Sequence, residues 1–347
     1  MSDRGLYLDR GIGETRGVAV VDGRPAWLFV RRDDEPAALR LGARSVARVR
    51  AVEKAFQAAF LDLPDGTEAL LPLHADATPP VRGAAVEVEV RGEPRQDKLA
   101  VARLLGPAEG APRLLAEGPT VEDDLRRVGG AGALVEGEAA RDVADAAEAE
   151  ALETVHPLPG GGSIAIEPTR ALVAVDVDLG GRGGTDSKRA ARAANLAALA
   201  EGARLLRLKG LGGLVIFDLV GRGHDGKALL AAARAAFAQD NPGVAIDQVS
   251  RFGTLMLTVP RRRRSALDRL LDETGRLTAG SAALRLARAL EREGRSAPGA
   301  RLAAACAPAT ARAFEALRPD VADRLGPRFV VEARPDWPVD RVEARAL

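Results

Sequence analysis

Two apolar segments of the sequence end in aspartates. Residues 171–178 read Ala-Leu-Val-Ala-Val-Asp-Val-Asp, and residues 212–218 read Gly-Gly-Leu-Val-Ile-Phe-Asp. A helical pattern lies between them, so we expect two parallel strands whose carboxyl ends meet at one edge of a sheet. Asp176, Asp178 and Asp218 would converge there, with Asp176 and Asp178 on the same face of their strand. Converging carboxylates favour Mg²⁺ or Mn²⁺ and predict metal-assisted phosphate chemistry.

The connection between these segments contains both glycine and a long helix. Apolar residues at helical spacing predict the helix over residues 186–207. Residues 180–184 read Gly-Gly-Arg-Gly-Gly, which is either a phosphate cradle or a flexible turn. The same two interpretations apply to residues 221–224, where His224 lacks a nucleophile pattern and is interpreted as a loop residue rather than a base.

Composition limits the classes of protein and of site. The 347 residues suffice for two or three domains, and 50 basic against 49 acidic residues mean that a polyanion must bind to local patches. The single cysteine excludes a disulfide framework and a cysteine-built zinc site within one chain. Neither a membrane-length apolar run nor a signal-peptide core is seen, so we expect a cytoplasmic protein without a membrane partner.

A second pattern precedes the aspartate-bearing segments. Five short alternating segments separated by turn residues predict a small barrel of the OB type, which commonly binds single-stranded nucleic acid. They are residues 46–52, 57–62, 69–73, 85–90 and 98–103. Of Phe56 and Phe60, we expect one in the barrel core and the other free to stack on a base.

The remaining segments predict smaller elements. Residues 6–30 suggest two strands joined at Asp22-Gly23, and residues 106–112 suggest a linker. A helix beginning near Thr120 with acids in its first turn precedes a strand and an alanine-rich helix, and a hairpin is expected over residues 244–259. The four arginines at 261–264 are interpreted as a solvated run, with an RNA or acidic-partner patch as the alternative. The last 80 or so residues predict two helices and a short strand.

Five segments lie in a recognisable order at residues 57–63, 162–178, 195–196, 207–218 and 250–253, the last reading Ser-Arg-Phe-Gly. Together they resemble the catalytic half of the ribonuclease E/G family of bacterial endoribonucleases. The resemblance implies an α/β multidomain fold in which an RNase H-like subdomain is interrupted by an OB-fold barrel and followed by a DNase I-like catalytic subdomain and a small α/β C-terminal domain. The implied boundaries are 1–38 and 112–158 for the split subdomain, 39–106 for the barrel, 159–264 for the catalytic subdomain and 265–347 for the small domain.

The resemblance also implies roles for individual residues. The family's metal ligands fall on Asp176 and Asp218, with Asp178 in support where the family usually has Asn. The remaining candidates would contact RNA: Phe56, Phe60, Lys98, Arg182, Asn195 and Arg251.

Three departures from the family pattern bear on activity. The family's second acid after Asp218 is Gly221 here, its Cys-Pro-x-Cys zinc link is absent, and the 5′-monophosphate sensor after the barrel is missing. We therefore expect no zinc and weak or lost selectivity for 5′-monophosphorylated RNA, while a homodimer through the small domain stays open.

Three functional hypotheses follow. The first is a Mg²⁺-dependent endoribonuclease that hydrolyses single-stranded RNA in RNA processing or decay. The second is an RNA-binding protein of the same fold with a weak or inactive site, and the third is a structural partner of another ribonuclease.

Overall fold

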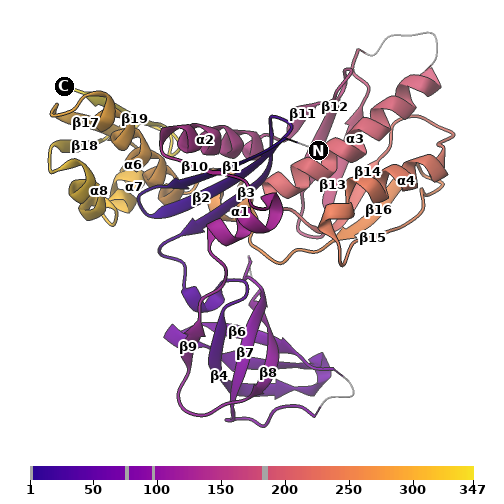
Figure 1. Ribbon diagram of the computed structural model, residues 1–347, viewed down its shortest axis with the longest axis horizontal. Coiled ribbons are helices and arrows are strands. Elements are labelled where there is room, and N and C mark those ends of the chain that lie inside the picture. The colour runs from indigo at the N-terminus through magenta and orange to yellow at the C-terminus, as the bar shows by residue number, and fades with distance from the viewer. Residues whose placement is uncertain (1–2, 75–77, 96–97, 182–186) are drawn as a thin grey trace.

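The computed structural model describes residues 3–74, 78–95, 98–181 and 187–347. Three lobes extend from one another around a small central sheet (Figure 1): the barrel, a lobe formed by the aspartate-bearing sheet and its helices, and the C-terminal domain. Among the described helices, none combines the length and the apolar character needed to cross a bilayer.

The central sheet is assembled from two separate parts of the chain. Strands β1 (Arg4–Arg10), β2 (Glu14–Val21) and β3 (Arg24–Arg32) form a meander, and β10 (Leu134–Glu136) pairs in parallel with β1. Positive φ angles of 50° at Asp22 and 76° at Gly23 form the expected tight hairpin. The prediction of two strands was wrong: a turn at residues 11–13 divides the first segment, so three strands form. Helices α1 (Val121–Gly129) and α2 (Glu138–Leu152) lie against this sheet, and the Thr120–Asp123 capping box starts α1.

The barrel follows the predicted strand pattern. Its strands are β4 (Arg44–Glu53), β5 (Ala58–Asp62), β6 (Glu68–Pro72), β7 (Ala85–Gly92) and β8 (Ala100–Pro107). They follow the order β4-β5-β6-β8-β7 and close through pairing of β7 with β4, with β6 and β8 parallel. A further strand that the sequence did not predict, β9 (Arg113–Ala116), lies on β4 directly after the predicted linker. Neither Phe56 nor Phe60 belongs to the barrel core, so the expectation that one of them is a core residue was wrong.

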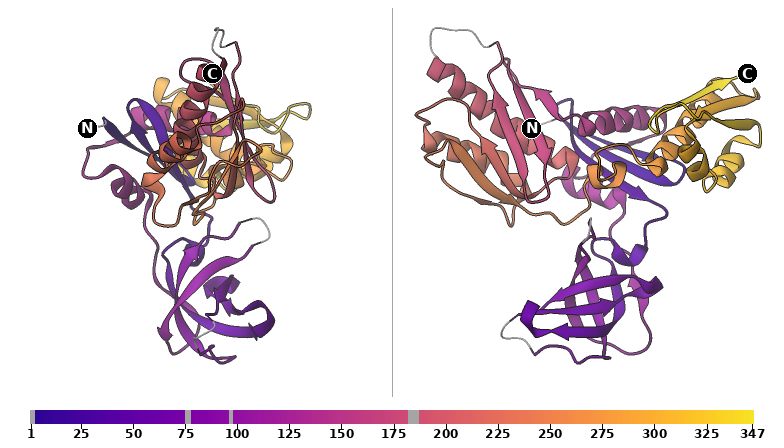
Figure 2. Two further views of the ribbon diagram at one scale, coloured as in Figure 1. Left: turned by 90° about the vertical axis from the view of Figure 1, so that its right-hand side faces the viewer. Right: turned by 180° about the vertical axis from the view of Figure 1, so that it is seen from behind.

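The aspartate-bearing segments lie in a second sheet of order β11-β12-β13-β14-β16-β15. The strands are β11 (Val155–Pro157), β12 (Ser163–Pro168), β13 (Val173–Asp178), β14 (Gly213–Asp218), β15 (Ala245–Ile246) and β16 (Thr254–Val259). Helix α3 (Ser187–Lys209) connects β13 to β14, and α4 (Gly226–Ala236) follows β14. Both helices cover one face of the sheet, and the view from behind in Figure 2 shows the other face free of helices. Gly202 of α3 permits close packing, because a Cβ atom there would come within 2.7 Å of the Phe217 ring.

The C-terminal domain contains more structure than the sequence indicated. Helices α5 (Ala266–Leu270), α6 (Ala279–Ser296), α7 (Pro308–Phe314) and α8 (Arg318–Leu325) accompany a sheet of order β18-β17-β19. Its strands are β17 (Leu302–Cys306), β18 (Phe329–Ala333) and β19 (Val342–Ala346). Only β18 was predicted, because the alanine-rich β17 has the local propensity of a helix.

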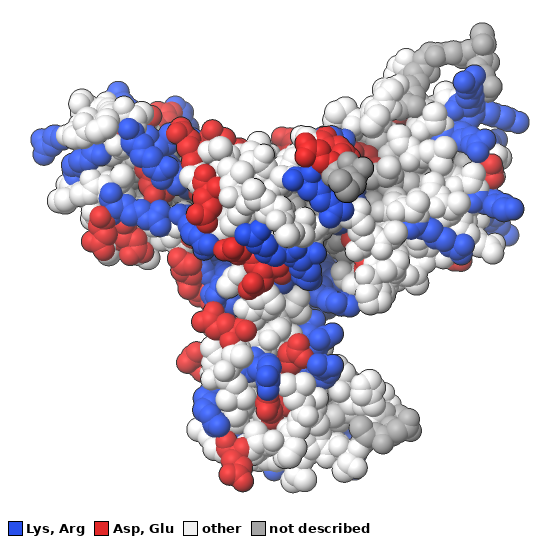
Figure 3. Space-filling view, in the orientation of Figure 1, with Lys and Arg blue, Asp and Glu red and all other residues white. Residues whose placement is uncertain are grey.

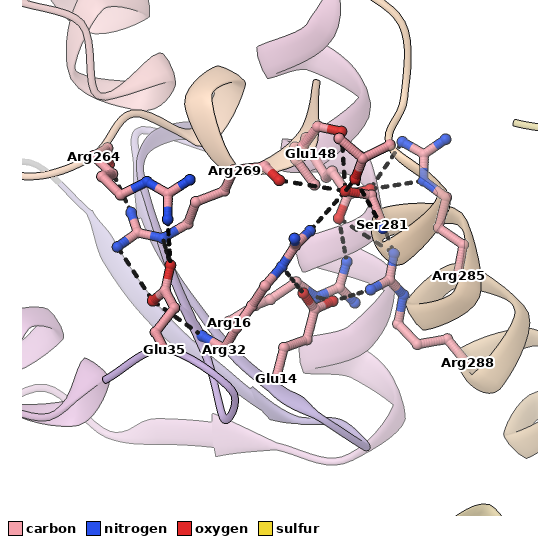
Figure 4. Close-up of polar contacts among 12 residues, drawn as sticks. Glu14, Arg16, Arg32, Glu35, Glu148, Arg264, Arg269, Ser281, Arg285 and Arg288 are labelled. Carbon is pink, nitrogen blue, oxygen red and sulfur yellow. Dashed lines mark hydrogen bonds and ion pairs between the residues drawn. The ribbon is translucent and has the colours of Figure 1, made fainter. Parts of the chain in front are cut away.

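Buried arginine–carboxylate networks join the lobes (Figure 4). Arg269 of α5 contacts Glu35 after β3 at 2.9 Å and Glu93 of the barrel at 2.9 Å. The arginine run belongs to this network: Arg263 contacts Asp124 of α1 at 2.6 Å, and Arg264 contacts Glu35 at 3.2 Å. The interpretation as a solvated run was wrong for Arg263 and Arg264, which are half-buried against acidic partners from other parts of the chain, whereas Arg262 is exposed.

Candidate metal centre and RNA-facing surface

Asp176 and Asp218 are direct neighbours across two parallel strands. The register of β13 and β14 pairs Val173 with Val215 and continues to Asp176 opposite Asp218, at the last paired position. Adjacent strands are about 4.8 Å apart, and paired residues project from the same face. The strand–helix–strand geometry expected from the sequence is therefore present, with both carboxylates at one sheet edge.

Both carboxylates project away from the core. Val175, Val177 and Phe217 are buried beneath the helices, whereas Asp176 and Asp218 are exposed on the helix-free face. Ala165 of β12 is the partner of Asp176, and Thr254 of β16 is the partner of Asp218, so the two aspartates are flanked by small side chains. Among the described residues, neither carboxylate has a hydrogen-bond or ion-pair partner. Two neighbouring carboxylates that are not paired with a cationic side chain are suited to binding a metal cation.

The donor set fits a hydrated Mg²⁺ or Mn²⁺ ion. Within the described parts of the chain there is no group of three or more His, Cys, Asp or Glu side chains that could enclose a metal. Mg²⁺ does not require such a cage, because it commonly retains several waters and binds one or two carboxylates together with substrate phosphates. Asp176 and Asp218 are the residues that could supply such a set of oxygen ligands.

Asp178 lies one pleat beyond this pair, on the same exposed face. It is paired with Ser163 of β12, and its Oδ1 accepts a hydrogen bond from the backbone N–H of Gly180 at 2.8 Å. One carboxylate oxygen is thus used to shape the start of the loop after β13. Its predicted supporting role in catalysis stays a prediction.

A turn between β15 and β16 completes the edge beside Asp218. The Ser250 hydroxyl accepts hydrogen bonds from the backbone N–H groups of Phe252 and Thr254, both at 3.2 Å, and lies 2.7 Å from Thr254 Oγ1. The backbone N–H of Leu219, next to Asp218, donates to Gly253 O at 3.0 Å. Sequence reasoning identified Ser-Arg-Phe-Gly as a motif but missed Ser250 and Thr254 as the residues that fix it beside the carboxylates.

A basic cavity of about 490 Å³ opens between the start of α3 and the loop after β14. It is lined by Lys188, Arg189, Arg192 and Arg222, with Asp225 as its acidic residue. Asp225 is already engaged, because it contacts Arg192 at 3.3 Å and caps α4 through the Ala228 N–H. Lysine and arginine side chains also gather at the outer end of this lobe in Figure 3. The cavity therefore has the charge to bind a phosphate.

Asn195, which lines this cavity, fixes the loop after β14 through its side-chain amide. It is 1% exposed; its side-chain amide donates to Val220 O at 3.0 Å, and its carbonyl oxygen accepts from Val220 N at 3.0 Å. Both of its polar groups are thus committed to the loop that begins two residues after Asp218. A direct contact with RNA stays a prediction, while this geometry gives Asn195 a positioning role.

The RNA-binding candidates on the barrel lie apart from one another. Phe56 is 78% exposed just before β5, and Phe60 of β5 lies outside the barrel core, with the Arg50 guanidinium 5.9 Å from the centroid of its ring. Lys98 is exposed before β8, next to the end of β6 that pairs with Ala100, whereas Phe56 lies near the opposite end of β6. These three residues are therefore spread over neighbouring barrel strands and do not form a single contact point.

The last two predicted residues have different outcomes. Arg182 lies outside the described residues. Arg251 is exposed in the turn beside Asp218, and its guanidinium lies 4.7 Å from the centroid of the Phe252 ring. Its predicted contact with phosphate stays a prediction.

Comparison with known proteins gives a consistent result over the same region. The model of the ribonuclease E/G family matches residues 140–264, which include most of α2 and the whole second sheet. Ribonuclease E of Escherichia coli K12 is 40% identical over 108 residues, covering 30% of this chain and 10% of that protein. A chloroplastic ribonuclease E/G-like protein of Arabidopsis thaliana is 35% identical over 115 residues, covering 31% of this chain and 11% of that protein.

The match is therefore confined to part of each protein. Ribonuclease E of a Nostoc species, 34% identical over 128 residues, is covered over 18% of its length. The shared segment contains the two paired aspartates, the helix between their strands and the Ser-Arg-Phe-Gly turn. Over this segment, the chain is similar to the ribonuclease E/G family.

Proposed function

We propose that this protein is a divalent-metal-dependent endoribonuclease that cleaves single-stranded RNA by hydrolysis of phosphodiester bonds. The observation that carries the proposal is the pairing of Asp176 with Asp218 at the carboxyl ends of adjacent parallel strands. The similarity to the ribonuclease E/G family and the names of the relatives that the chain matches support the same activity.

Asp176 and Asp218 would hold a Mg²⁺ or Mn²⁺ ion. A bound ion of this kind neutralises charge on a phosphodiester and makes a water more acidic. The protein's own contribution is to hold the two carboxylates in register on a rigid sheet and to leave the adjacent face open to substrate. Rigid strand ends place ligands more accurately than loops do.

The surface around the carboxylates suits a nucleic acid backbone. The basic cavity beyond Asp218 and the exposed Arg251 offer cations for phosphates, which supply most of the affinity in non-specific nucleic acid binding. We further propose that the closed five-stranded barrel is an OB fold that holds the strand through Phe56, Phe60 and Lys98. The RNase H-like and DNase I-like assignments of the two sheets are part of the same proposal.

The direct test is removal of one carboxylate charge without change of shape. We expect Asp218→Asn to lower the cleavage rate of a short unstructured RNA in Mg²⁺ by at least about 100-fold, since metal assistance is worth several kcal/mol. Asp247→Asn is the matched control, because Asp247 is exposed near the same sheet, beyond β15. We expect it to cleave at the wild-type rate.

Two results would contradict the proposal. Cleavage by purified Asp218→Asn at the wild-type rate would remove the paired carboxylates from the mechanism. Binding of labelled RNA by the wild-type protein without cleavage, across titrations of Mg²⁺ and Mn²⁺, would identify an RNA-binding protein without nuclease activity.

A further inference from the structure

Phe252 is exposed beside the carboxylate pair. Its side chain is 76% exposed, and Phe56 of the barrel is the other phenylalanine exposed to this extent among the described residues. Burying an aromatic ring of this size is worth about 1.5–3 kcal/mol, so leaving one in water sacrifices stability. An exposed ring at a candidate active site is therefore a candidate binding group.

The turn that carries Phe252 is fixed before any ligand arrives. Ser250 accepts from the backbone of Phe252 and of Thr254, and Ser250 N donates to Thr254 O at 2.8 Å. Gly253 has a φ of 85°, and a Cβ atom there would lie 3.1 Å from His224 Nε2. A preformed turn reduces the entropy lost when the ring binds a ligand.

The ring is within reach of a nucleotide adjoining the carboxylates. Thr254 is the register partner of Asp218, and Phe252 precedes it by two residues. Paired Cα atoms are about 5 Å apart and two residues span at most about 7 Å, so the Cα atoms of Phe252 and Asp218 lie within roughly 12 Å.

The two faces of the ring are in different environments. The Arg251 guanidinium lies 4.7 Å from the ring centroid and occupies one face, which leaves the other for a second planar group. Unpaired bases stack on exposed aromatic rings, and stacking tolerates any base because each has a π face. The neighbouring cation favours a ligand that also carries a phosphate.

We propose that Phe252 is the stacking platform for an unpaired RNA base next to the phosphate that Asp176 and Asp218 address. The proposal rests on the endoribonuclease function and extends it by naming the residue that positions the nucleotide at the cut. The barrel would hold the strand at a distance, while Phe252 sets which phosphate reaches the carboxylates.

The test is a double-mutant cycle between the ring and the base. Phe252→Ala should lower kcat/KM on a single-site RNA by about 5- to 150-fold, which corresponds to roughly 1–3 kcal/mol for loss of one stacked base. Phe252→Trp should retain most of the activity. An RNA with an abasic residue at the stacked position should lose the same factor with the wild-type protein and lose nothing further with Phe252→Ala.

Controls separate stacking from other effects. Leu214→Ala, at the far end of β14 from Asp218 and 39% exposed, should leave kcat/KM unchanged on both RNAs. If the wild-type protein is active and Phe252→Ala has the same kcat/KM, the stacking platform is overturned but the nuclease function is not. The platform is also overturned if the loss of kcat/KM in Phe252→Ala adds in full to the loss caused by an abasic residue at every position tested. That result would instead indicate a packing contact or a protein-binding site.

Failure of the proposed function gives a different pattern. The same variants are titrated with the same RNAs by fluorescence anisotropy in the absence of divalent metal. A base-dependent loss of affinity in Phe252→Ala, with a wild-type protein that never cleaves, would refute the nuclease and retain the platform. Absence of RNA binding by the wild-type protein would overturn both.

Discussion

Glu148 of α2 connects the central sheet to the C-terminal domain, and its neutralisation should lower the stability of the protein. Its side chain is 4% exposed and contacts Arg16 of β2 at 3.0 Å. It also contacts Arg285 at 2.8 Å and Arg288 at 3.3 Å, both on α6 (Figure 4). Burial alone would raise the pKa of Glu148, but the charges of Arg288, Arg16 and Arg285 outweigh it and hold the pKa below 4.5.

The free energy of unfolding that Glu148→Gln removes depends on which acidic partners the arginines keep. Removing one partner of a buried ion pair typically costs about 3–5 kcal/mol. Arg16 keeps Asp9 at 2.6 Å and Asp145 at 2.8 Å, and Arg288 keeps Glu14. Arg285 loses its carboxylate partner, but its side chain is 28% exposed and can be hydrated. Because the two more deeply buried arginines keep acidic partners, we expect the lower end, about 3 kcal/mol. With a urea m-value of about 3 kcal/mol/M, the midpoint should fall by about 1 M.

Tryptophan fluorescence can follow this unfolding, because the chain has two tryptophans and they lie on opposite sides of the junction. Trp27 is in β3 and Trp337 is in the C-terminal domain. Asp142→Asn on α2 is the matched control: Asp142 is 65% exposed and lies 3.7 Å from Arg292, so its loss should cost less than about 1 kcal/mol.

The pH dependence has a definite sign. Because the folded-state pKa of Glu148 is depressed, its contribution is present above about pH 4.5 and is lost as the pH falls through the folded-state value. The difference between wild type and Glu148→Gln should shrink on acidification. An equal midpoint for both proteins at pH 7, or a difference independent of pH, would refute the reasoning.

Two further predictions concern buried polar groups. Asn195→Ala leaves the N–H and C=O of Val220 without their partners, which costs about 1–3 kcal/mol for each group unless the loop opens to water. Amide hydrogen exchange over residues 219–225 should therefore accelerate by at least about tenfold. Unchanged exchange would refute the positioning role of Asn195. Burial lowers the pKa of Lys209 to about 8, whereas the unfolded chain holds that proton to about 10.5, so stability should rise with pH between these values. Urea midpoints at pH 7.5 and 9.5 should show this rise in the wild-type protein, and an equal rise in Lys209→Met would contradict the assignment.

Local patterns were sufficient for much of the fold. The alternation in the barrel segments predicted all five strands of the closed barrel because one face of each strand is buried. Thr120 and the acids after it predicted the start of α1, since a hydroxyl and an N3 carboxylate satisfy free N–H groups at a helix start. The order of apolar strand, helix and apolar strand likewise predicted the parallel pairing of β13 and β14.

Prediction failed where the deciding partner lies far away in the sequence. β17 is a strand although residues 303–305 are all alanine, because pairing with β18 and β19 overrides the helical preference of alanine. The arginines at 263 and 264 are half-buried because Glu35, Glu93 and Asp124 approach them from other parts of the chain. The role of Ser250 was missed for a different reason, since only the folded turn shows which backbone N–H groups donate hydrogen bonds to its hydroxyl.

For the site itself, the sequence alone determined which residues carry charge and that two aspartates end parallel strands, because strand periodicity and crossover handedness are local properties of the chain. Tertiary structure decided the rest: the register that sets Asp176 opposite Asp218, the open face onto which they project, and the turn that brings Phe252 beside them. Register and exposure depend on packing between segments tens of residues apart, and that information appears only once the whole chain has folded.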